Sequence, residues 1–307
     1  MSNEENILDP QTTCGFVALV GAPNAGKSTL MNHLVGFKVS IVTPKVQTTR
    51  SRIRGFCQHE KAQVIFVDTP GIFEPKRRLD RAMVQAAWQG AGDADVVVLL
   101  VDAARRKVDA DTWRIIEGLK ATGRPAILAL NKVDLVPREE LLPRAAELND
   151  TGVFSDTFMI SAESGNGCAD LLTHLAGRLP KGPWLYPEDE VSDLPQRLLA
   201  AEATREQIFL RLHQELPYAI TVETETWKEL EDGSARINQV IYVERDGHKG
   251  IVLGKGGQQI KTIGMAARQE LEKILDRRLH LVLHVKVRSN WMDDPERYRE
   301  WGLDYKA

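Results

Sequence analysis

The sequence predicts an α/β fold with a doubly wound, mostly parallel sheet, followed by a smaller α+β domain. Short apolar runs alternate with helical patterns over the first half of the chain, as in sheets whose strands are buried on both faces. Each glycine-rich or acidic motif follows one of these runs, at the carboxyl edge where such sheets bind ligands. The later residues differ in charge and in the order of their elements, which indicates a second domain.

The apolar runs define the strands expected in the first domain, which spans residues 16–180 after an N-terminal tail over 1–15. These strands are expected over 16–20, 64–67, 96–101, 126–130 and 158–160. The helical patterns between them cover 79–91, 111–121, 139–149 and 168–179.

A linker over 181–194, with two prolines and no apolar period, separates the first domain from the second. Pro195 is expected to begin a helix that runs to about Glu215. Its buried side is expected to carry Leu198, Leu199, Ile208, Phe209 and Leu212. Strands are then expected over 219–225, 235–245 and 279–287, with a short helix and a helix over 258–275 between the last two. This second domain covers 195–290, and 291–307 forms a C-terminal tail.

Composition limits the class of protein. The longest apolar run has six residues, far short of the roughly 20 that span a bilayer, so an integral membrane protein is excluded. The polar, acidic start does not resemble a secretory signal. Three scattered cysteines, Cys14, Cys57 and Cys168, argue for a reduced, cytoplasmic compartment. Peripheral association with the inner membrane stays open, and a monomer is expected.

Charge is spread unevenly along the chain. The chain carries a net charge of −3, which by itself does not suggest a nucleic-acid partner. Residues 187–233 carry four basic and twelve acidic side chains, whereas residues 251–290 carry eight basic and three acidic ones. A charge run is often only a solvated face, but this positive stretch coincides with a glycine motif described below. The coincidence favours a local phosphate-binding surface.

The segment GAPNAGKS lies between a predicted strand and a predicted helix. Glycines let such a loop fold around phosphates, and its backbone N–H groups and the helix N-terminus face the anion. Lys27 is expected to reach the terminal phosphates, and Ser28 to offer its hydroxyl to Mg²⁺. The candidate nucleotide ligands here are Gly21, Ala22, Pro23, Asn24, Ala25, Gly26, Lys27, Ser28 and Thr29.

Two further features complete the predicted phosphate and magnesium site. Asp68 begins the segment DTPG, and with a phosphate loop upstream its carboxylate is expected to hold Mg²⁺. Gly71 leaves its N–H free to approach the terminal phosphate. Between these motifs lies QTTR, in which we expect Thr49, rather than Thr48, to be the third magnesium ligand.

A later pair of motifs predicts which base is bound. In NKVD, the carboxylate of Asp134 can accept hydrogen bonds from the guanine ring N–H and amino group, which adenine does not offer together. The segment SAE is expected to close over the carbonyl of the base. The candidate base-side ligands are Asn131, Lys132, Asp134, Ser161, Ala162 and Glu163. The nucleotide is therefore predicted to be GTP or GDP rather than an adenine nucleotide.

The second glycine motif lies in the positive stretch of the second domain. GKGG falls between two helical patterns, where a GxxG loop can clamp a nucleic-acid backbone because missing side chains let phosphates approach. The candidate RNA ligands are Gly254, Lys255, Gly256, Gly257 and Lys261. Single-stranded bases are expected to lie in a groove beside this loop. The apolar floor of the groove is expected to contain Ile251, Ile260 and Ile263.

These motifs together resemble the Era family, bacterial GTPases with a C-terminal KH domain, and the resemblance covers about Phe16 to Asn290. It implies a P-loop GTPase domain followed by a type II KH domain. The implied partners are GTP, the 3′ end of 16S rRNA and the 30S ribosomal subunit, whose maturation the protein would assist. Mg²⁺ is the implied cofactor.

One position departs from the common GTPase pattern. Many GTPases place a glutamine after the glycine of the second motif to orient the attacking water, and here Ile72 stands there. The resemblance implies slow hydrolysis by another route, with K⁺ held by Asn24 near the phosphates. No general base is assigned. The alternative is a constitutive KH scaffold whose GTP site turns over little; a tRNA-modification GTPase is disfavoured because no catalytic cysteine lies near the C-terminus.

Overall fold

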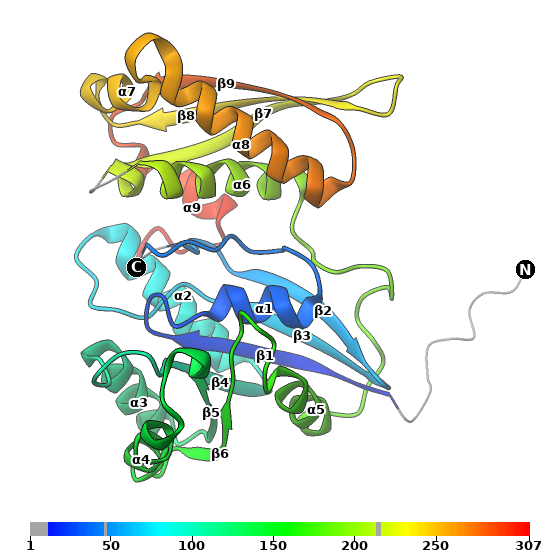
Figure 1. Ribbon diagram of the computed structural model, residues 1–307, viewed down its shortest axis with the longest axis vertical. Coiled ribbons are helices and arrows are strands. Elements are labelled where there is room, and N and C mark those ends of the chain that lie inside the picture. The colour runs from blue at the N-terminus through cyan, green and yellow to red at the C-terminus, as the bar shows by residue number, and fades with distance from the viewer. Residues whose placement is uncertain (1–11, 46–47, 213–215) are drawn as a thin grey trace, which may run out of the picture. The chain divides into compact units, whose positions relative to one another are not determined.

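The computed structural model describes residues 12–45, 48–212 and 216–307 (Figure 1). The chain divides into two compact units. The first contains described residues up to Ser40, Thr49–Asp193 and Trp301–Ala307, and the second contains Ile41–Thr48 and Leu194–Glu300. Among the described helices, none has the length and hydropathy needed to cross a membrane.

A six-stranded sheet forms the centre of the first unit, with its strands in the spatial order β2-β3-β1-β4-β5-β6. All neighbouring strands are parallel except β2 and β3. The strands are β1 (Thr13–Gly21), β2 (Ile53–His59), β3 (Ala62–Asp68), β4 (Val96–Asp102), β5 (Ala126–Asn131) and β6 (Phe154–Met159). The chain order changes direction at β1, and open α/β sheets bind ligands at such a switch point.

Helices cover both faces of this sheet. α1 and α5 contact each other and lie against β2 and β3, whereas α2, α3 and α4 share one apolar core with β1, β4 and β5. The helices are α1 (Lys27–Val35), α2 (Arg78–Asp93), α3 (Ala110–Thr122), α4 (Arg138–Asn149) and α5 (Cys168–Arg178). The predicted doubly wound α/β class is confirmed.

The edge strand β2 was absent from the strands expected from the sequence. It pairs antiparallel with β3, from Ile53 opposite Asp68 to His59 opposite Ala62. Its sequence, IRGFCQH, buries only its first, third and fourth residues. The apolar signal is too short to predict a strand, and pairing with the buried β3 stabilises it instead.

Residues 181–193 of the predicted linker over 181–194 belong to the first unit and are bonded to its strands. The backbone N–H of Phe56 donates to the carbonyl of Val191 at 2.8 Å. The rings of Phe56 and Tyr186 stack with centroids 3.7 Å apart. The side-chain amide of Gln63 donates to the carbonyl of Tyr186 at 2.7 Å. These contacts cover the outer edge of β2, which would otherwise offer unpaired backbone groups.

The second unit is a three-stranded sheet in the order β7-β8-β9, with β7 antiparallel and β9 parallel to β8. Helices α6 and α8 contact each other and pack against the sheet. The elements are α6 (Gln196–Arg211), β7 (Ile220–Glu229), β8 (Ala235–Val243), α7 (Asp246–Leu253), α8 (Gln258–Leu275), β9 (Leu279–Val287) and α9 (Pro295–Glu300). The predicted order of helix, strand, strand, short helix, helix, strand is confirmed, and it is that of a type II KH fold.

Helix α6 buries the apolar side that the sequence predicted. Leu199, Ile208, Phe209 and Leu212 are buried, while Leu198 is only half-buried. The α-helix ends at Arg211, and the predicted end at Glu215 lies outside the described residues.

The aromatic residues of the C-terminal tail pack inside the protein. Trp291 and Tyr298 are fully buried in the second unit, and the indole N–H of Trp291 donates to the carbonyl of Ala219 at 3.2 Å. Trp301 belongs to the first unit, where it lies beneath the guanidinium of Arg50. Packing, rather than exposure to a ligand, accounts for these three rings.

Candidate nucleotide site and RNA groove

The phosphate loop joins β1 to α1 at the switch point of the first sheet. Gly26 caps α1 in the left-handed region, with φ of 98°. A Cβ at this position would lie 2.1 Å from Nδ2 of Asn131, so a side chain cannot be accommodated. The sequence folds this way because only glycine permits both the backbone angle and the close approach. The N-terminal N–H groups of α1 are thereby left facing a potential anion.

Lys27 lies in this loop with its ammonium group turned inward. Its Nζ donates to the carbonyls of Gly21 at 3.0 Å and Ala22 at 3.1 Å, and the side chain is buried. Burial lowers the pKa of Lys27 to about 8, against the opposing attraction of Asp68. A triphosphate would supply the negative charge that this buried ammonium group lacks.

Asp68, at the end of β3, gathers hydroxyl groups around one carboxylate oxygen. Its Oδ2 accepts hydrogen bonds from Ser28 at 2.6 Å, Ser40 at 2.8 Å and Thr49 at 3.2 Å. Burial raises the pKa of Asp68, and the hydroxyl of Ser28 and the charge of Lys27 oppose that rise. Thr48 instead bonds to Thr43 and Lys45, while Gln47 lies outside the described residues.

The donor set around Asp68 fits Mg²⁺. Its other oxygen, Oδ1, is buried and has no hydrogen-bond partner among the described residues. A carboxylate beside the hydroxyls of Ser28 and Thr49, which lie 3.1 Å apart, is the oxygen-rich set that Mg²⁺ prefers. Asp68, Ser28 and Thr49 would hold the ion.

Gly71 and Ile72 lie against the phosphate loop. A Cβ on Gly71 would be 3.1 Å from Pro23, and the N–H of Ile72 donates to the carbonyl of Gly21 at 3.2 Å. The side chain of Ile72 is fully buried in the sheet core. It therefore neither offers a polar group nor faces a water molecule at the site.

Asn131 ties the base-side loops to the phosphate loop. Its Nδ2 donates to the carbonyl of Ala25 at 2.8 Å, and its Oδ1 accepts from the N–H of Ala162 at 2.9 Å. The side chain is buried, so these bonds are protected from water. Asn131 thus organises three loops rather than pointing freely toward a base.

The other predicted base-side residues differ in how far they are buried. Ser161 and Ala162 are buried beside Asn131, whereas Asp134 and Glu163 are exposed. The carboxylate of Asp134 has no hydrogen-bond or ion-pair partner in the described part of the chain. It is therefore available to a base. Lys132 pairs with Asp102 at 2.7 Å, a partner that no sequence motif indicated.

In the second unit, the GKGG segment forms a tight turn between α7 and α8. Gly256 and Gly257 have φ of 60° and 76°, backbone angles that other residues rarely adopt. Lys255 is exposed at the turn and Lys261 is exposed one turn into α8. The structure thus places both predicted lysines where a phosphate backbone could reach them.

A groove runs along the edge strand β9. Next to the GKGG turn is a recess of about 480 Å³, and a further recess of about 850 Å³ continues from it. The first is lined by Ile260, Lys261, Gly264, Met265, Arg268, Leu281, Val282 and Leu283. Of the three predicted floor residues, only Ile260 lines this recess. Ile263 is buried in the core, and Ile251 is exposed and does not line the recess.

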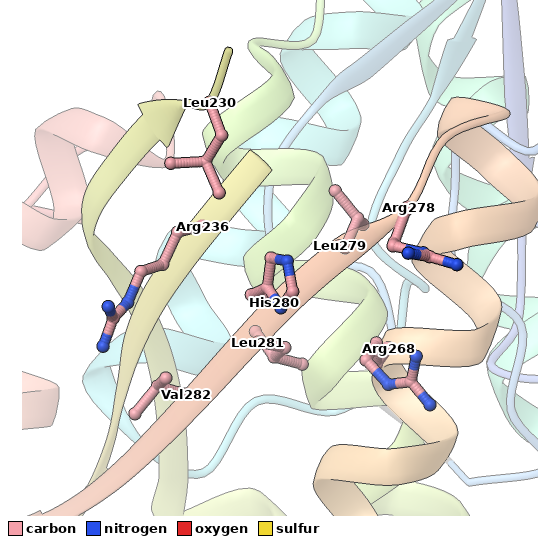
Figure 2. Close-up of a pocket in the computed structure, with 8 residues that line it drawn as sticks. All are labelled: Leu230, Arg236, Arg268, Arg278, Leu279, His280, Leu281 and Val282. Atoms are coloured by element: carbon pink, nitrogen blue, oxygen red, sulfur yellow. The ribbon is translucent and has the colours of Figure 1, made fainter. Parts of the chain in front are cut away.

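Arginines surround the second recess. Figure 2 shows Arg236 on the far side of β9 from Arg268 and Arg278, with His280 between them. Sequence reasoning missed these three arginines. The positive charge of residues 251–290 includes Arg268 and Arg278 but not Arg236. Sequence reasoning also missed Ser40, because a lone serine in a polar loop carries no motif.

Comparisons with known proteins agree with this geometry. Residues 16–132 match a family described as 50S ribosome-binding GTPase, and residues 215–292 match the KH domain family. The chain is 63% identical over 295 residues to GTPase Era of Sinorhizobium medicae, covering 96% of this chain and 94% of that one. It is 60% identical over 305 residues to GTPase Era of Mesorhizobium japonicum, covering 99% and 98%.

Two solved structures resemble the whole chain. One is a variant of Aquifex aeolicus Era bound to GDP and AlF4−, and the other is Era in complex with MgGDPNP and nucleotides 1506–1542 of 16S ribosomal RNA. Each has a TM-score of 0.89 and 40% identity, and covers 95% of this chain and 99% of its own.

Proposed function

The chain belongs to the Era family of GTPases, and we propose that it is a GTP-driven switch whose KH domain binds the 3′ end of 16S rRNA. It is a GTPase that converts GTP to GDP and phosphate. The further proposal is that nucleotide state controls RNA binding during maturation of the 30S subunit.

The nucleotide half of the proposal is supported by the geometry of the first unit. The N–H groups of the phosphate loop and Lys27 would bind the phosphates, and Asp134 would accept from the guanine ring. When Mg²⁺ is bound, it neutralises charge on the phosphate oxygens. Asp68, Ser28 and Thr49 would hold it there. Catalysis in this class depends mainly on positioning and charge stabilisation, and no general base is assigned.

Potassium is a separate part of the proposal. Asn24 has a left-handed backbone, with φ of 65°, within the phosphate loop. An amide oxygen beside the phosphates is a suitable ligand for K⁺, whose charge would stabilise the transition state in place of an arginine. Position 72 holds a buried isoleucine, so this position does not supply the glutamine that orients the attacking water in many GTPases. Equal hydrolysis rates in Na⁺ and K⁺ buffers would contradict this role.

The observation that carries the switch is the path of the chain between Ser40 and Thr49. Both residues donate to Asp68 in the first unit. The residues between them, Ile41–Thr48, belong to the second unit. A change at Asp68 on loss of the terminal phosphate would therefore act on a segment that is part of the RNA-binding unit.

That segment is held by α6 of the second unit. The N–H of Val42 donates to Glu206 at 2.8 Å. The ammonium group of Lys45 donates to the carbonyls of Phe209 and Leu212, and Arg205 donates to the carbonyl of Thr48. Both ends of the segment are thus anchored to one helix of the KH fold.

The experiment is GTP hydrolysis in K⁺ buffer with and without a short RNA of the 16S 3′-terminal sequence. The proposal predicts stimulation by that RNA and not by a scrambled RNA. Gly256→Asp, which adds negative charge at the KH turn, should abolish the stimulation while keeping basal hydrolysis. Gly92→Asp is the matched control, because Gly92 lies in α2 with open space around it. Tight RNA binding with unchanged turnover would favour the constitutive scaffold instead.

A further inference from the structure

We propose that Arg105 is a positioning residue of the GTPase site. It would keep the Pro23–Asn24 turn of the phosphate loop at a fixed position relative to the loop of residues 131–134, which is proposed to recognise the guanine base. The inference rests on the nucleotide site proposed above, and it concerns a residue outside every motif of that site. Arg105 lies in the loop that connects β4 to α3.

The guanidinium of Arg105 is fixed between two carboxylates. Its Nη1 lies 2.9 Å from Oδ2 of Asp109, and its Nε lies 3.7 Å from Oδ2 of Asp102. Asp109 is itself fixed as the N-cap of α3, where it accepts from the N–H of Thr112 at 2.9 Å. The planar fork of an arginine can satisfy such separate acceptors, whereas a lysine ammonium cannot do so in the same geometry.

The remaining arm of the guanidinium reaches the phosphate loop. Its Nη2 donates to the carbonyl of Pro23 at 3.2 Å. This carbonyl precedes Asn24, whose backbone is left-handed. Gly71 lies close to other atoms of Pro23, since a Cβ on Gly71 would be 3.1 Å from the ring Cγ and from the backbone N of Pro23. Arg105 and Gly71 therefore contact different atoms of the same turn.

Asp102 extends this contact to the base side. Its Oδ2 also pairs with the ammonium group of Lys132 at 2.7 Å. Its Oδ1 accepts from the N–H of Ala104 at 3.0 Å, which fixes the carboxylate at the end of β4. One carboxylate oxygen thus faces both Lys132 of the base loop and Arg105 of the phosphate loop.

This arrangement predicts an effect on turnover rather than on binding. Ground-state affinity for GTP comes from Lys27, the loop N–H groups and Asp134, none of which Arg105 contacts. The Pro23–Asn24 turn lies where the terminal phosphate is expected, and small misplacements there slow the chemical step. Loss of Arg105 should therefore lower kcat more than it raises KM.

The test compares steady-state GTP hydrolysis by Arg105→Ala and Arg106→Ala in the full chain. Arg106 is the neighbouring exposed arginine, and its side chain has no partner among the described residues. We expect Arg105→Ala to lower kcat about tenfold or more, with KM and GDP affinity within about threefold of wild type. Arg106→Ala should match wild type, and Lys27→Ala should abolish hydrolysis whether or not Arg105 contributes.

Two further variants make the proposal falsifiable. Arg105→Lys keeps the charge but loses the fork, so it should not recover kcat; full recovery would reduce the role to charge and overturn the proposal. Asp102→Asn removes the carboxylate behind Arg105 and should show a similar loss of kcat, even if Arg105→Ala fails to fold. A kcat within about twofold of wild type in a folded Arg105→Ala or in Asp102→Asn would also overturn it.

Discussion

The hydroxyl of Thr49 donates a 3.2 Å hydrogen bond to Asp68, whereas the hydroxyl of the adjacent Thr48 turns to Thr43. We therefore expect Thr49→Ala to weaken Mg²⁺-dependent binding of a GTP analogue by about tenfold, roughly the effect of one charge-assisted contact. GDP binding should change much less, because this ligand is needed when the terminal phosphate is present. Titrations of both nucleotides at several Mg²⁺ concentrations measure the difference.

Thr48→Ala is the matched control for that experiment. It removes the same number of atoms from the neighbouring residue without touching Asp68. Equal losses in the two variants would contradict the assignment of Thr49, and would indicate that the segment as a whole, rather than one hydroxyl, binds the ion.

The buried ammonium group of Lys27 predicts a pH dependence of GTP binding. Its pKa of about 8 in the nucleotide-free protein means that Lys27 loses its proton as the pH rises through 8. Phosphate charge favours the protonated form, so binding above pH 8 requires proton uptake and affinity falls as pH increases. We expect a decrease of about tenfold by pH 9, relative to pH 7.

Lys27→Arg separates this effect from titration of the nucleotide. Arginine stays charged over the whole range, so its affinity, though lower, should lack the component due to Lys27. The difference between the two pH profiles isolates residue 27. Parallel profiles would show that the protonation of Lys27 is not coupled to binding.

The sequence predicted the fold well because its signals are local. Apolar runs and glycine motifs alternate along β1, β3, β4 and β5, and each motif is a contiguous segment. By contrast, the edge strand β2 depends on pairing with β3 and on the cover supplied by residues 181–193. The contacts with residues 181–193 join residues more than a hundred positions apart, such as Gln58 and Glu188, and have no local signature.

The site, like the fold, was predictable where its residues belong to local motifs. Lys27, Asp68 and Asn131 belong to motifs, and the structure brings them to one edge of the sheet. Ser40 and Arg105 belong to no motif, and only the folded chain places them beside Asp68 and Pro23. Partners chosen by tertiary packing cannot be read from spacing alone.

Trp291 predicts a large effect on stability. Its ring is fully buried and its N–H bonds to Ala219. Trp291→Ala should lower the free energy of unfolding by about 3–5 kcal/mol, the usual cost of removing a buried large aromatic. Trp291→Phe should cost less than Trp291→Ala, because it keeps an aromatic ring in the core. It should still destabilise, because it leaves the carbonyl of Ala219 without its donor. Chemical denaturation of both variants checks this order; RNA binding lost at full stability would instead assign the ring to RNA recognition.

Arg277 and Arg278 provide a matched pair for testing the groove. Arg277 forms two hydrogen bonds with Glu229, at 2.6 and 3.1 Å, whereas the side chain of Arg278 has no partner in the described part of the chain and lines the larger recess. An arginine without a carboxylate partner retains its full charge for a phosphate. Arg278→Gln should therefore weaken RNA binding and reduce the slope of log affinity against log salt by about 0.7, the value for one phosphate contact on a single strand. Arg277→Gln should leave that slope unchanged, because its charge is already neutralised. If both variants reduce the slope equally, RNA responds to the general charge of this face, and the recess does not hold a phosphate at Arg278.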